Sequence, residues 1–324
     1  MPNTLTIWSN TAFSLAATDK LRRGLSPHRL LLSEKQTYNL GVSPGDPLLD
    51  QADIAFGQPK PEQVMALPRV KWVHLTTAGY GRYDREDFRS ALKQRGAIMT
   101  NSSTVYAEPC AQHAVAFMLA LSRQLPAAMD NQRTQRAWPA LDLRAQSKLL
   151  TGQTALITGF GAIGRRIAEL LGPFHMNLIA VRRTPRGDEP IPTIPDSDID
   201  KHLARADHIL NTLPDSPQTK NFFSAQRLAL CKPTAHFYNV GRGSTVDQEA
   251  LCALLLERKL SAAYLDVMTP EPLPPDDPLW TTPNCHITPH TAGGHDLEHD
   301  SNVSHFLENF RRFTTNQPFL DRII

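Results

Sequence analysis

The chain has 324 residues, 41% of them hydrophobic, which is enough for two domains that each bury a substantial core. Its 34 basic and 32 acidic residues give a formal net charge of +2. This balance argues against nucleic acid or a membrane surface as the partner and favours a small molecule.

Four cysteines, Cys110, Cys231, Cys252 and Cys285, are scattered without paired spacing. This pattern favours free, buried thiols in a reducing compartment over a disulfide framework. The N-terminus has neither a basic segment nor a long apolar run, so we expect no signal peptide. Together these features predict a cytoplasmic protein.

Five apolar runs separated by helical or turn-rich pieces predict a parallel sheet in the first hundred residues. They are LTIWS (5–9), HRLLLS (28–33), ADIAFG (52–57), VKWVHLT (70–76) and GAIMTN (96–101). Helical spacing occurs at residues 12–23 and 84–94, and Gly24 and Gly96 are the expected C-terminal caps. This order predicts a flavodoxin-like first domain.

A glycine-containing loop, TTAGYG at residues 76–81, follows the fourth of these runs. Its main-chain N–H groups could hold an anion. An ordinary turn explains the same local sequence, so both interpretations stay open at this point.

The longest apolar helix is predicted at residues 106–123, interrupted by Pro109, Gln112 and His113. It is too polar to span a membrane, and so apolar a helix must be buried from several sides, between domains or against a second subunit. Residues 133–148 are polar and predict an irregular loop over a neighbouring surface.

Residues 154–172, TALITGFGAIGRRIAELLG, predict a strand, a glycine turn and a helix without a break. Gly159 permits the sharp turn, Gly161 lets a pyrophosphate approach the main chain, and Gly164 lets the helix pack on its strand. The helix would direct free N–H groups and its positive dipole end toward phosphate. The sequence therefore predicts a dinucleotide site here.

Further apolar runs after the glycine turn predict five more strands, which makes six in this sheet. The runs lie at residues 177–181, 208–213, 235–240, 262–267 and 285–288. Helical segments between several of them, at 198–205, 225–230 and 247–258, are typical of the doubly wound dinucleotide fold. Residues 296–314 have helical spacing and should return to the first domain, whereas the proline-rich stretches 185–195 and 269–278 predict surface loops.

Reactive side chains follow three of these strands, at the edge where ligands of such folds bind. Arg242 lies on a glycine-flanked loop, where its planar guanidinium can meet a carboxylate bidentately. Asp266 and then Glu271 follow the next strand, and His290 follows the last.

In these motifs the chain resembles the D-isomer-specific 2-hydroxyacid dehydrogenases, in particular glyoxylate/hydroxypyruvate reductases. The resemblance runs in family order through VKWVHLTTAGY, TNSSTVYAEPCAQHAVAFMLALSR, GFGAIG, LNTLPDSPQT, NVGRGS, LDVMTPEPLP, ITPHTAGG and NFRRF. It implies an α/β protein with two doubly wound domains and the cleft between them. The flavodoxin-like substrate domain would comprise residues 1–100 and 295–324, and the Rossmann dinucleotide-binding domain residues 101–294.

The resemblance also implies roles for individual residues. Arg242, Glu271 and His290 become the catalytic set, with Arg242 and His290 also binding substrate beside Thr77, Ala78 and Gly79. The residues expected to bind cofactor are Gly159, Gly161, Ala162, Ile163, Gly164, Arg182, Arg183, Thr184, Thr212, Leu213, Pro214, Val240, Gly241, Asp266 and His290. Among these, Asp266 would lie beside the nicotinamide carboxamide and residues 212–214 along the adenosine.

The sequence departs from the family pattern, or allows another interpretation, at four points. Members often have a Glu-His pair where this chain has Gln112 and His113. The formate-oxidising branch has glutamine where this chain has Glu271, so Glu271 argues against membership of that branch. Histidines at 286, 290, 295, 299 and 305 could suggest zinc, but no cysteine or carboxylate set completes a ligand pattern, so we expect no metal. A catalytically idle nucleotide sensor or corepressor on the same fold is the alternative function, because some such binders retain the triad.

The end of the second strand predicts which dinucleotide binds. NAD-binding folds place an acid there for the ribose hydroxyls, whereas this chain has Arg182, Arg183 and Thr184, which offer donors to a 2′-phosphate. The nearest carboxylates, Asp188 and Glu189, lie well into the following loop and should not reach back to the ribose. Together with the resemblance, the sequence therefore predicts an enzyme that uses NADP(H) rather than NAD to interconvert a small 2-keto acid and a D-2-hydroxy acid. The apolar helix at 106–123 and the resemblance both suggest a homodimer through the dinucleotide-binding domain.

Overall fold

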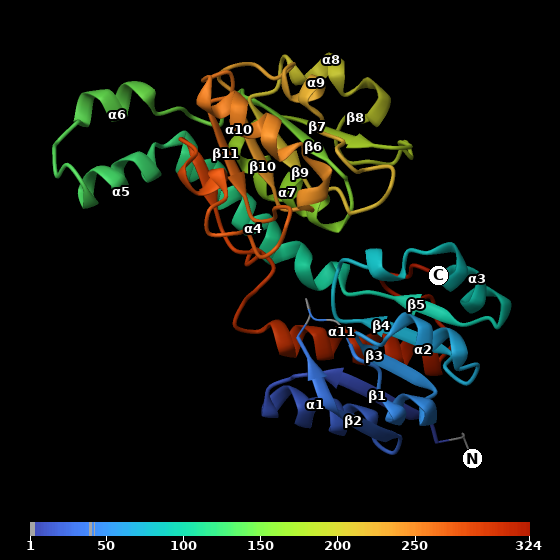
Figure 1. Ribbon diagram of the computed structural model, residues 1–324. Helices are drawn as coiled ribbons and strands as arrows, with labels where there is room; N and C mark the ends of the chain where they lie inside the picture. The colour runs from blue at the N-terminus through green and yellow to red at the C-terminus, as the bar shows by residue number, and fades with distance from the viewer. Residues whose placement is uncertain (1–3, 39–40, 42) are drawn as a thin grey trace. The chain divides into compact units, whose positions relative to one another are not determined.

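The computed structural model describes residues 4–38, 41 and 43–324. The chain divides into two compact units (Figure 1), the first comprising Met1–Tyr106 and Gly294–Ile324 and the second Ala107–Gly293. Each unit contains one parallel sheet with helices. The predicted α/β class with two doubly wound sheets is therefore confirmed.

The first unit has a five-stranded sheet in the order β2-β1-β3-β4-β5, with every pairing parallel. This is the flavodoxin-like strand order. The strands are β1 (Thr6–Thr11), β2 (Arg29–Thr37), β3 (Ile54–Gly57), β4 (Trp72–Leu75) and β5 (Ile98–Thr100). The helices are α1 (Leu15–Leu25), α2 (Pro61–Ala66), α3 (Glu86–Gln94) and α11 (Glu298–Thr314). The prediction did not include α2.

Helix α11 returns to the first unit, as predicted, and covers its sheet with aromatic side chains. The Phe306 ring stacks on Phe56 of β3 at a centroid distance of 4.0 Å and on Trp72 of β4 at 5.1 Å. The sequence predicted Gly24 as the C-terminal cap of α1, but Gly24 lies inside this helix. A Cβ atom on Gly24 would lie 2.5 Å from a methyl carbon of Leu307, so the glycine allows α1 to approach α11 closely.

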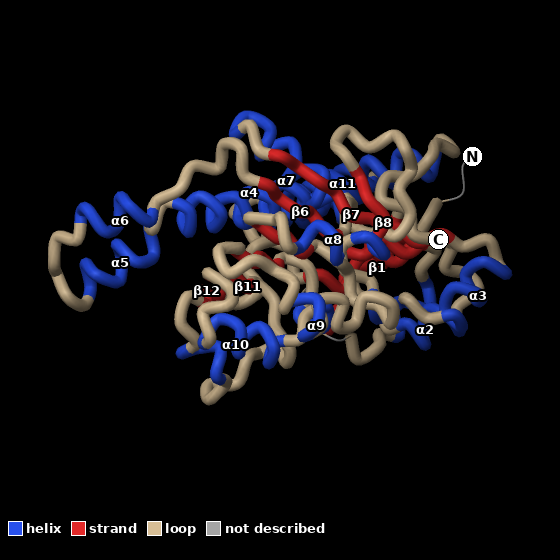
Figure 2. The backbone as a smooth tube through the Cα atoms, turned by 90° about the horizontal axis from the view of Figure 1, so that it is seen from above, coloured by secondary structure: helices blue, strands red, loops and turns tan. Residues whose placement is uncertain are grey.

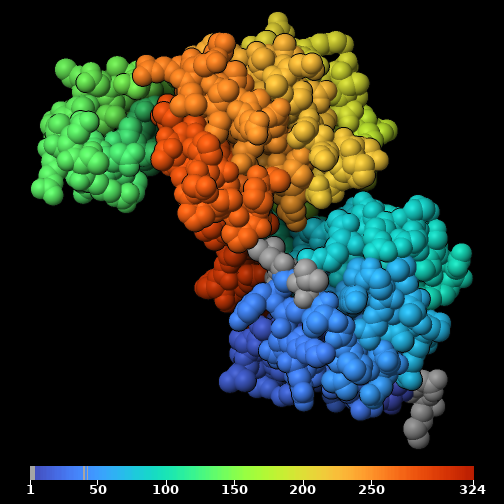
Figure 3. Space-filling model, viewed as in Figure 1, coloured from blue at the N-terminus to red at the C-terminus, as the bar shows by residue number. Residues whose placement is uncertain are grey.

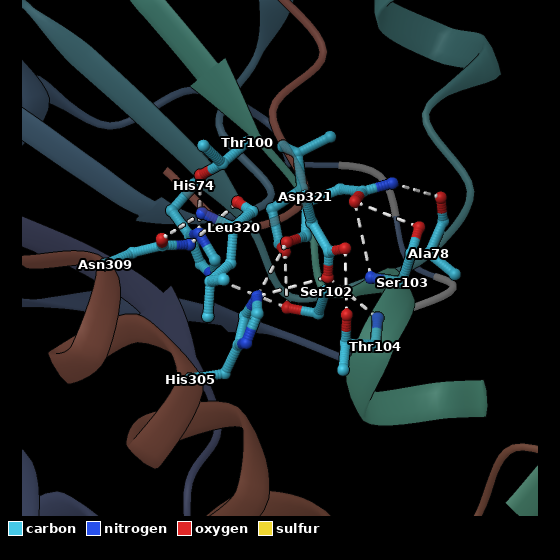
Figure 4. Close-up of polar contacts among 12 residues, drawn as sticks. His74, Ala78, Thr100, Ser102, Ser103, Thr104, His305, Asn309, Leu320 and Asp321 are labelled. Atoms are coloured by element: carbon cyan, nitrogen blue, oxygen red, sulfur yellow. Dashed lines mark hydrogen bonds and ion pairs between the residues drawn. The ribbon is translucent and has the colours of Figure 1, made fainter. Parts of the chain in front are cut away.

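The C-terminal tail pairs with β5 at the end of the first unit. The N–H of Ile323 donates to Met99 O at 2.8 Å, and Asp321 accepts hydrogen bonds from the main-chain N–H and the hydroxyl of Thr104, at 2.7 and 2.9 Å. His305 of α11 lies 3.2 Å from the same carboxylate. The contacts of Asp321 belong to a polar cluster (Figure 4) and fix the first turn of α4 (Ser103–Ser122).

The second unit has a seven-stranded parallel sheet in the order β12-β11-β10-β9-β6-β7-β8. Its strands are β6 (Thr154–Thr158), β7 (Asn177–Arg182), β8 (Thr193–Pro195), β9 (His208–Asn211), β10 (His236–Asn239), β11 (Ala262–Leu265) and β12 (Cys285–Ile287). The seventh strand, β8, lies in a stretch predicted to be a loop, because an edge strand tolerates the prolines that argued against pairing.

Helices cover both faces of this sheet, as a doubly wound fold requires. Leu156 and Phe237 pack with residues of α8 (Asp200–Leu203), α9 (Ala225–Leu228) and α10 (Gln248–Leu256). On the opposite face, Phe117 of α4 stacks on Tyr264 of β11 at 3.7 Å. Short 3₁₀ turns complete the chain at Pro47–Gln51, Gly81–Tyr83, Gly172–Phe174, Asp196–Asp198, Gly243–Thr245 and Pro278–Thr281. Among the described residues, no helix has the length and apolarity that a membrane crossing needs.

The segment 133–148 is not the irregular loop that the sequence suggested. Helices α5 (Leu125–Arg133) and α6 (Ala140–Gln146) form an arm that projects from the rest of the second unit in all three views (Figures 1, 2 and 3). Neither helix has a buried residue. Trp138, between them, is 92% exposed, and Leu141 is 82% exposed.

Candidate functional site

The glycine turn joins β6 to α7 (Ala162–Leu171) in the geometry that its sequence predicts. Gly159 has φ +80°, and a Cβ atom there would lie 2.9 Å from the carbonyl carbon of Thr212. A Cβ on Gly164 would lie 2.9 Å from Gly159 O, whereas a Cβ on Gly161 would meet nothing nearer than 4.0 Å. The turn is therefore tightly packed behind and open at Gly161, where a pyrophosphate could approach the first turn of α7.

Two neighbouring loops lie against this turn at the carboxyl edge of the sheet. The Thr212 hydroxyl donates to Gly159 O at 2.6 Å. A Cβ atom on Gly241 would lie 2.6 Å from Leu213 O, so only glycine lets these two loops touch. The structure thus brings together the predicted cofactor residues of the loops after β6, β9 and β10, with Pro214 exposed and Val240 buried.

A buried network of side chains holds these loops, and the sequence analysis missed it. Asn211 Nδ2 donates to Asn239 Oδ1 at 3.1 Å and to the Thr245 hydroxyl at 2.6 Å. Asn239 Nδ2 and the Thr245 hydroxyl in turn donate to the main-chain oxygen of Arg242 at 3.1 and 2.7 Å. The backbone of the catalytic candidate is therefore fixed independently of its guanidinium, whose Nη1 donates to Gly241 O at 2.6 Å. A polar residue that ends two neighbouring strands, as Asn211 and Asn239 do, was the available signal.

His290 and Glu271 lie within hydrogen-bond distance of each other, the contact that the sequence analysis expected of them. His290 Nδ1 lies 2.7 Å from Glu271 Oε2, while Glu271 Oε1 accepts the N–H of Met268 at 3.0 Å. Burial acts to raise the pKa of Glu271, but the hydrogen bond and charge of His290, with further help from Met268 and Arg242, lower it overall. An ionised carboxylate only accepts hydrogen bonds, so Nδ1 carries a proton and Nε2 is left for a substrate.

Asp266 holds the loop that contains His290 through hydrogen bonds. The carboxylate is buried, with the residue 2% exposed, and it accepts hydrogen bonds from the Thr288 hydroxyl at 2.6 Å and from the N–H groups of Thr291 and Ala292 at 2.9 and 3.0 Å. Asp266 O also accepts the N–H of His290, which has φ +53°. This strained conformation is held by its surroundings. The placement of Asp266 beside a carboxamide stays a prediction.

The loop after β7 folds back on the end of its strand. It doubles over through Gly187 (φ +84°), and Glu189 Oε1 lies 3.1 Å from Nη1 of Arg182. The expectation that Glu189 does not reach the ribose stays a prediction. The carboxylate also accepts the N–H groups of Arg186 and Gly187 at 2.9 Å, and its side chain is only 3% exposed. The Glu189 carboxylate is therefore hydrogen-bonded to the main chain of its own loop and paired with Arg182, whereas Arg183 is exposed.

The remaining candidates lie in other surroundings. Thr77, Ala78 and Gly79 follow β4 in the first unit and are half-buried. Gln112 donates to Glu108 at 2.6 Å, and the His113 ring lies 5.6 Å from Tyr264. Within the described part of the chain, no three His, Cys, Asp or Glu side chains gather as a metal site.

Comparison with known proteins extends this picture. The family model described as "D-isomer specific 2-hydroxyacid dehydrogenase, NAD binding domain" matches residues 115–292, more than half of the chain. The chain belongs to this family. It is therefore an NAD(P)-dependent oxidoreductase of 2-hydroxy acids.

Individual relatives of this dehydrogenase agree. It is 30% identical over 236 residues to glyoxylate/hydroxypyruvate reductase B of Pectobacterium carotovorum, and the matched region covers 72% of each chain. A D-isomer specific 2-hydroxyacid dehydrogenase family protein of Aeromonas salmonicida is 29% identical over 99% of both chains, with a TM-score of 0.78. The corresponding dehydrogenase of Xanthobacter autotrophicus, solved with NADPH and MES, shares the fold at 23% identity, with a TM-score of 0.83 over 99% of this chain and 98% of that one. None of these matches supports the idle sensor.

Proposed function

We propose that this dehydrogenase is an NADP(H)-dependent reductase of small 2-keto acids that works reversibly on D-2-hydroxy acids. The observation that carries the proposal is the 2.7 Å contact between His290 Nδ1 and Glu271 Oε2. The unit that holds this pair also holds Arg242 and the glycine turn.

The proposed chemistry follows from charge. NADPH, when bound, supplies the hydride that reduces C2 of the keto acid. As negative charge builds on the carbonyl oxygen, His290 as an imidazolium donates the Nε2 proton to it. Glu271 fixes the ring orientation and stabilises the imidazolium, and Arg242 holds the substrate carboxylate and polarises the carbonyl. We also assign carboxylate binding to the main-chain N–H groups around Ala78 and Gly79.

The test is turnover. NADPH absorbance is followed with glyoxylate, hydroxypyruvate and a series of longer 2-keto acids, and we expect oxidation with the short ones. If none of them is reduced by an enzyme that binds NADPH, the idle sensor is the better account.

We propose NADPH as the preferred cofactor because of the loop after β7. Glu189 is buried against Arg182 and cannot take the ribose hydroxyls, while the exposed Arg183 and Thr184 remain available to a 2′-phosphate. The fold is also one on which NADPH binds, as in the Xanthobacter structure.

Replacing Arg183 with alanine is expected to raise KM for NADPH about 10- to 100-fold, since a hydrogen bond to a charged group contributes about 1.5 to 3 kcal/mol. KM for NADH, which lacks the phosphate, is the internal control and should stay the same. Steady-state kinetics with both cofactors measure the ratio. Equal KM changes for NADPH and NADH would show that Arg183 does not contact the phosphate.

We propose that the protein is a homodimer in which the second subunit covers the arm of α5 and α6. Helices of nine and seven residues are marginal in water without tertiary packing, and these two bury none of their side chains. The exposed Trp138 and Leu141 give the arm an apolar surface that a second copy can cover.

The double variant Trp138→Ser, Leu141→Ser is therefore expected to sediment as a monomer at micromolar concentration, where the wild type sediments as a dimer. Sedimentation velocity distinguishes the two. A monomeric wild type would refute the proposal, and an unchanged dimer in the variant would place the interface elsewhere.

A cytoplasmic location is likewise our proposal. All four cysteines are free, and three of them have a pKa raised to about 12 by burial: Cys110, Cys231 and Cys285. Such unreactive thiols suit a reducing compartment.

A further inference from the structure

We infer that Thr77 and Asn101 are positioning residues, which lock the loop 77–80 so that three consecutive main-chain N–H groups face outward to receive the carboxylate of the 2-keto acid. The inference rests on the proposed function and adds to it the device that shapes the carboxylate subsite. Neither side chain is assigned contact with the substrate. Their effect comes through the backbone.

Three successive carbonyls of the loop are each held by a donor of the first unit. Thr77 O accepts the N–H of Ser102 at 3.1 Å. Ala78 O accepts Asn101 Nδ2 at 2.7 Å, a bond drawn at the edge of the cluster in Figure 4. Gly79 O accepts the hydroxyl of Thr77 at 2.7 Å. Each of the three peptide planes is therefore fixed by its own hydrogen bond.

A trans peptide directs its N–H opposite to its C=O. Holding the three carbonyls toward these donors consequently turns the N–H groups of Ala78, Gly79 and Tyr80 away from them. Within the part of the chain that the structure describes, none of these N–H groups has a hydrogen-bond acceptor, and all three residues are half-buried. A row of outward N–H groups is a binding site for an anion.

The two locking side chains are themselves oriented by further bonds. Asn101 is 1% exposed, and its Oδ1 accepts the N–H and the hydroxyl of Ser103 at 3.3 and 3.0 Å, which directs Nδ2 toward Ala78 O. The Thr77 hydroxyl accepts Gln58 Nε2 at 3.2 Å. Its own proton is thereby left for Gly79 O. The Asn101 amide nitrogen and the Thr77 hydroxyl can therefore act only as donors to these two carbonyl oxygens.

The loop contains no cation, so the direction of its peptide dipoles sets its affinity for a carboxylate. A loop with one peptide plane turned over would present a carbonyl oxygen, which repels the same ligand. The hydrogen bonds of Thr77 and Asn101 therefore affect binding of the substrate carboxylate and not binding of the nucleotide. Their loss can thus be distinguished from a loss of cofactor binding.

The test compares Thr77→Val, which keeps the shape and removes the hydroxyl, with Thr77→Ser, which restores the hydroxyl. We expect Thr77→Val to raise KM for the 2-keto acid about tenfold or more, with the dissociation constant of NADPH unchanged. Thr77→Ser should recover most of this loss, and Asn101→Ala should raise KM in the same way. Thr282→Val is the matched control, because it removes a buried hydroxyl that donates to Pro278 O, away from the loop.

Calorimetric binding of oxamate to the NADPH-loaded enzyme gives a readout that does not need turnover. We expect Thr77→Val and Asn101→Ala to weaken oxamate binding by the same factor as they raise KM. If wild type reduces no 2-keto acid but binds oxamate, and the variants weaken that binding, the proposed function fails and the carboxylate site stands. If both variants fold and neither KM nor oxamate binding changes, or if Thr77→Ser is as impaired as Thr77→Val, the inference is wrong.

Discussion

Replacement of His290 by glutamine is expected to lower kcat for 2-keto acid reduction by about 100- to 10,000-fold, the range that a positioned general acid contributes. Glutamine keeps a polar side chain of similar reach but cannot transfer the proton from Nε2. NADPH binding should persist, because the glycine turn is packed by the loop of Thr212 and not by His290. Stopped-flow kinetics with a short 2-keto acid, beside a direct measurement of the NADPH dissociation constant, check both parts.

The pH dependence of the wild type gives a second check on His290. Reduction takes up one proton at the carbonyl oxygen and oxidation of the hydroxy acid releases one, so reduction should slow as pH rises and oxidation should speed up. The pKa of Glu271 is lowered, so its carboxylate is charged through the neutral range, and the stabilisation that depends on this charge is lost as pH falls through that lowered pKa. A His290→Gln enzyme that retained wild-type kcat would rule out the assignment.

The Arg242→Lys variant is expected to lose about 100-fold in kcat/KM for the keto acid. Lysine keeps the charge but not the planar fork, so one of two charge-assisted hydrogen bonds to the carboxylate is lost or misaligned. The loop itself should not move, because Asn239 and Thr245 hold the main-chain oxygen of residue 242 without using its side chain. Unchanged kcat/KM in a variant of normal stability would mean that another group binds the carboxylate.

Local sequence was sufficient for the elements whose geometry is local. The turn at Gly159 and Gly164 needs only a strand before it and a helix after it, and both are visible in the order of apolar residues. Arg242 and His290 were found because each follows a strand of the same sheet, and parallel strands bring such positions to one edge.

Features that depend on distant partners could not be predicted in this way. Gly24 looks like a helix cap until Leu307, far along the chain, is placed against it. The contact between Glu189 and Arg182 was not predicted, because the fold of the loop through Gly187 is not apparent from spacing alone. The arm helix α6 (Ala140–Gln146) has only seven residues, which is too short for the apolar periodicity on which the prediction of helices rests.

The stereochemistry of the reduction tests the central claim most directly. Purified enzyme is supplied with hydroxypyruvate and NADPH, the oxidation of NADPH is followed by absorbance, and the product is resolved on a chiral column. The proposed function predicts stoichiometric formation of D-glycerate, which disappears in His290→Gln. Formation of L-glycerate, or NADPH binding without oxidation by any short 2-keto acid, would contradict it.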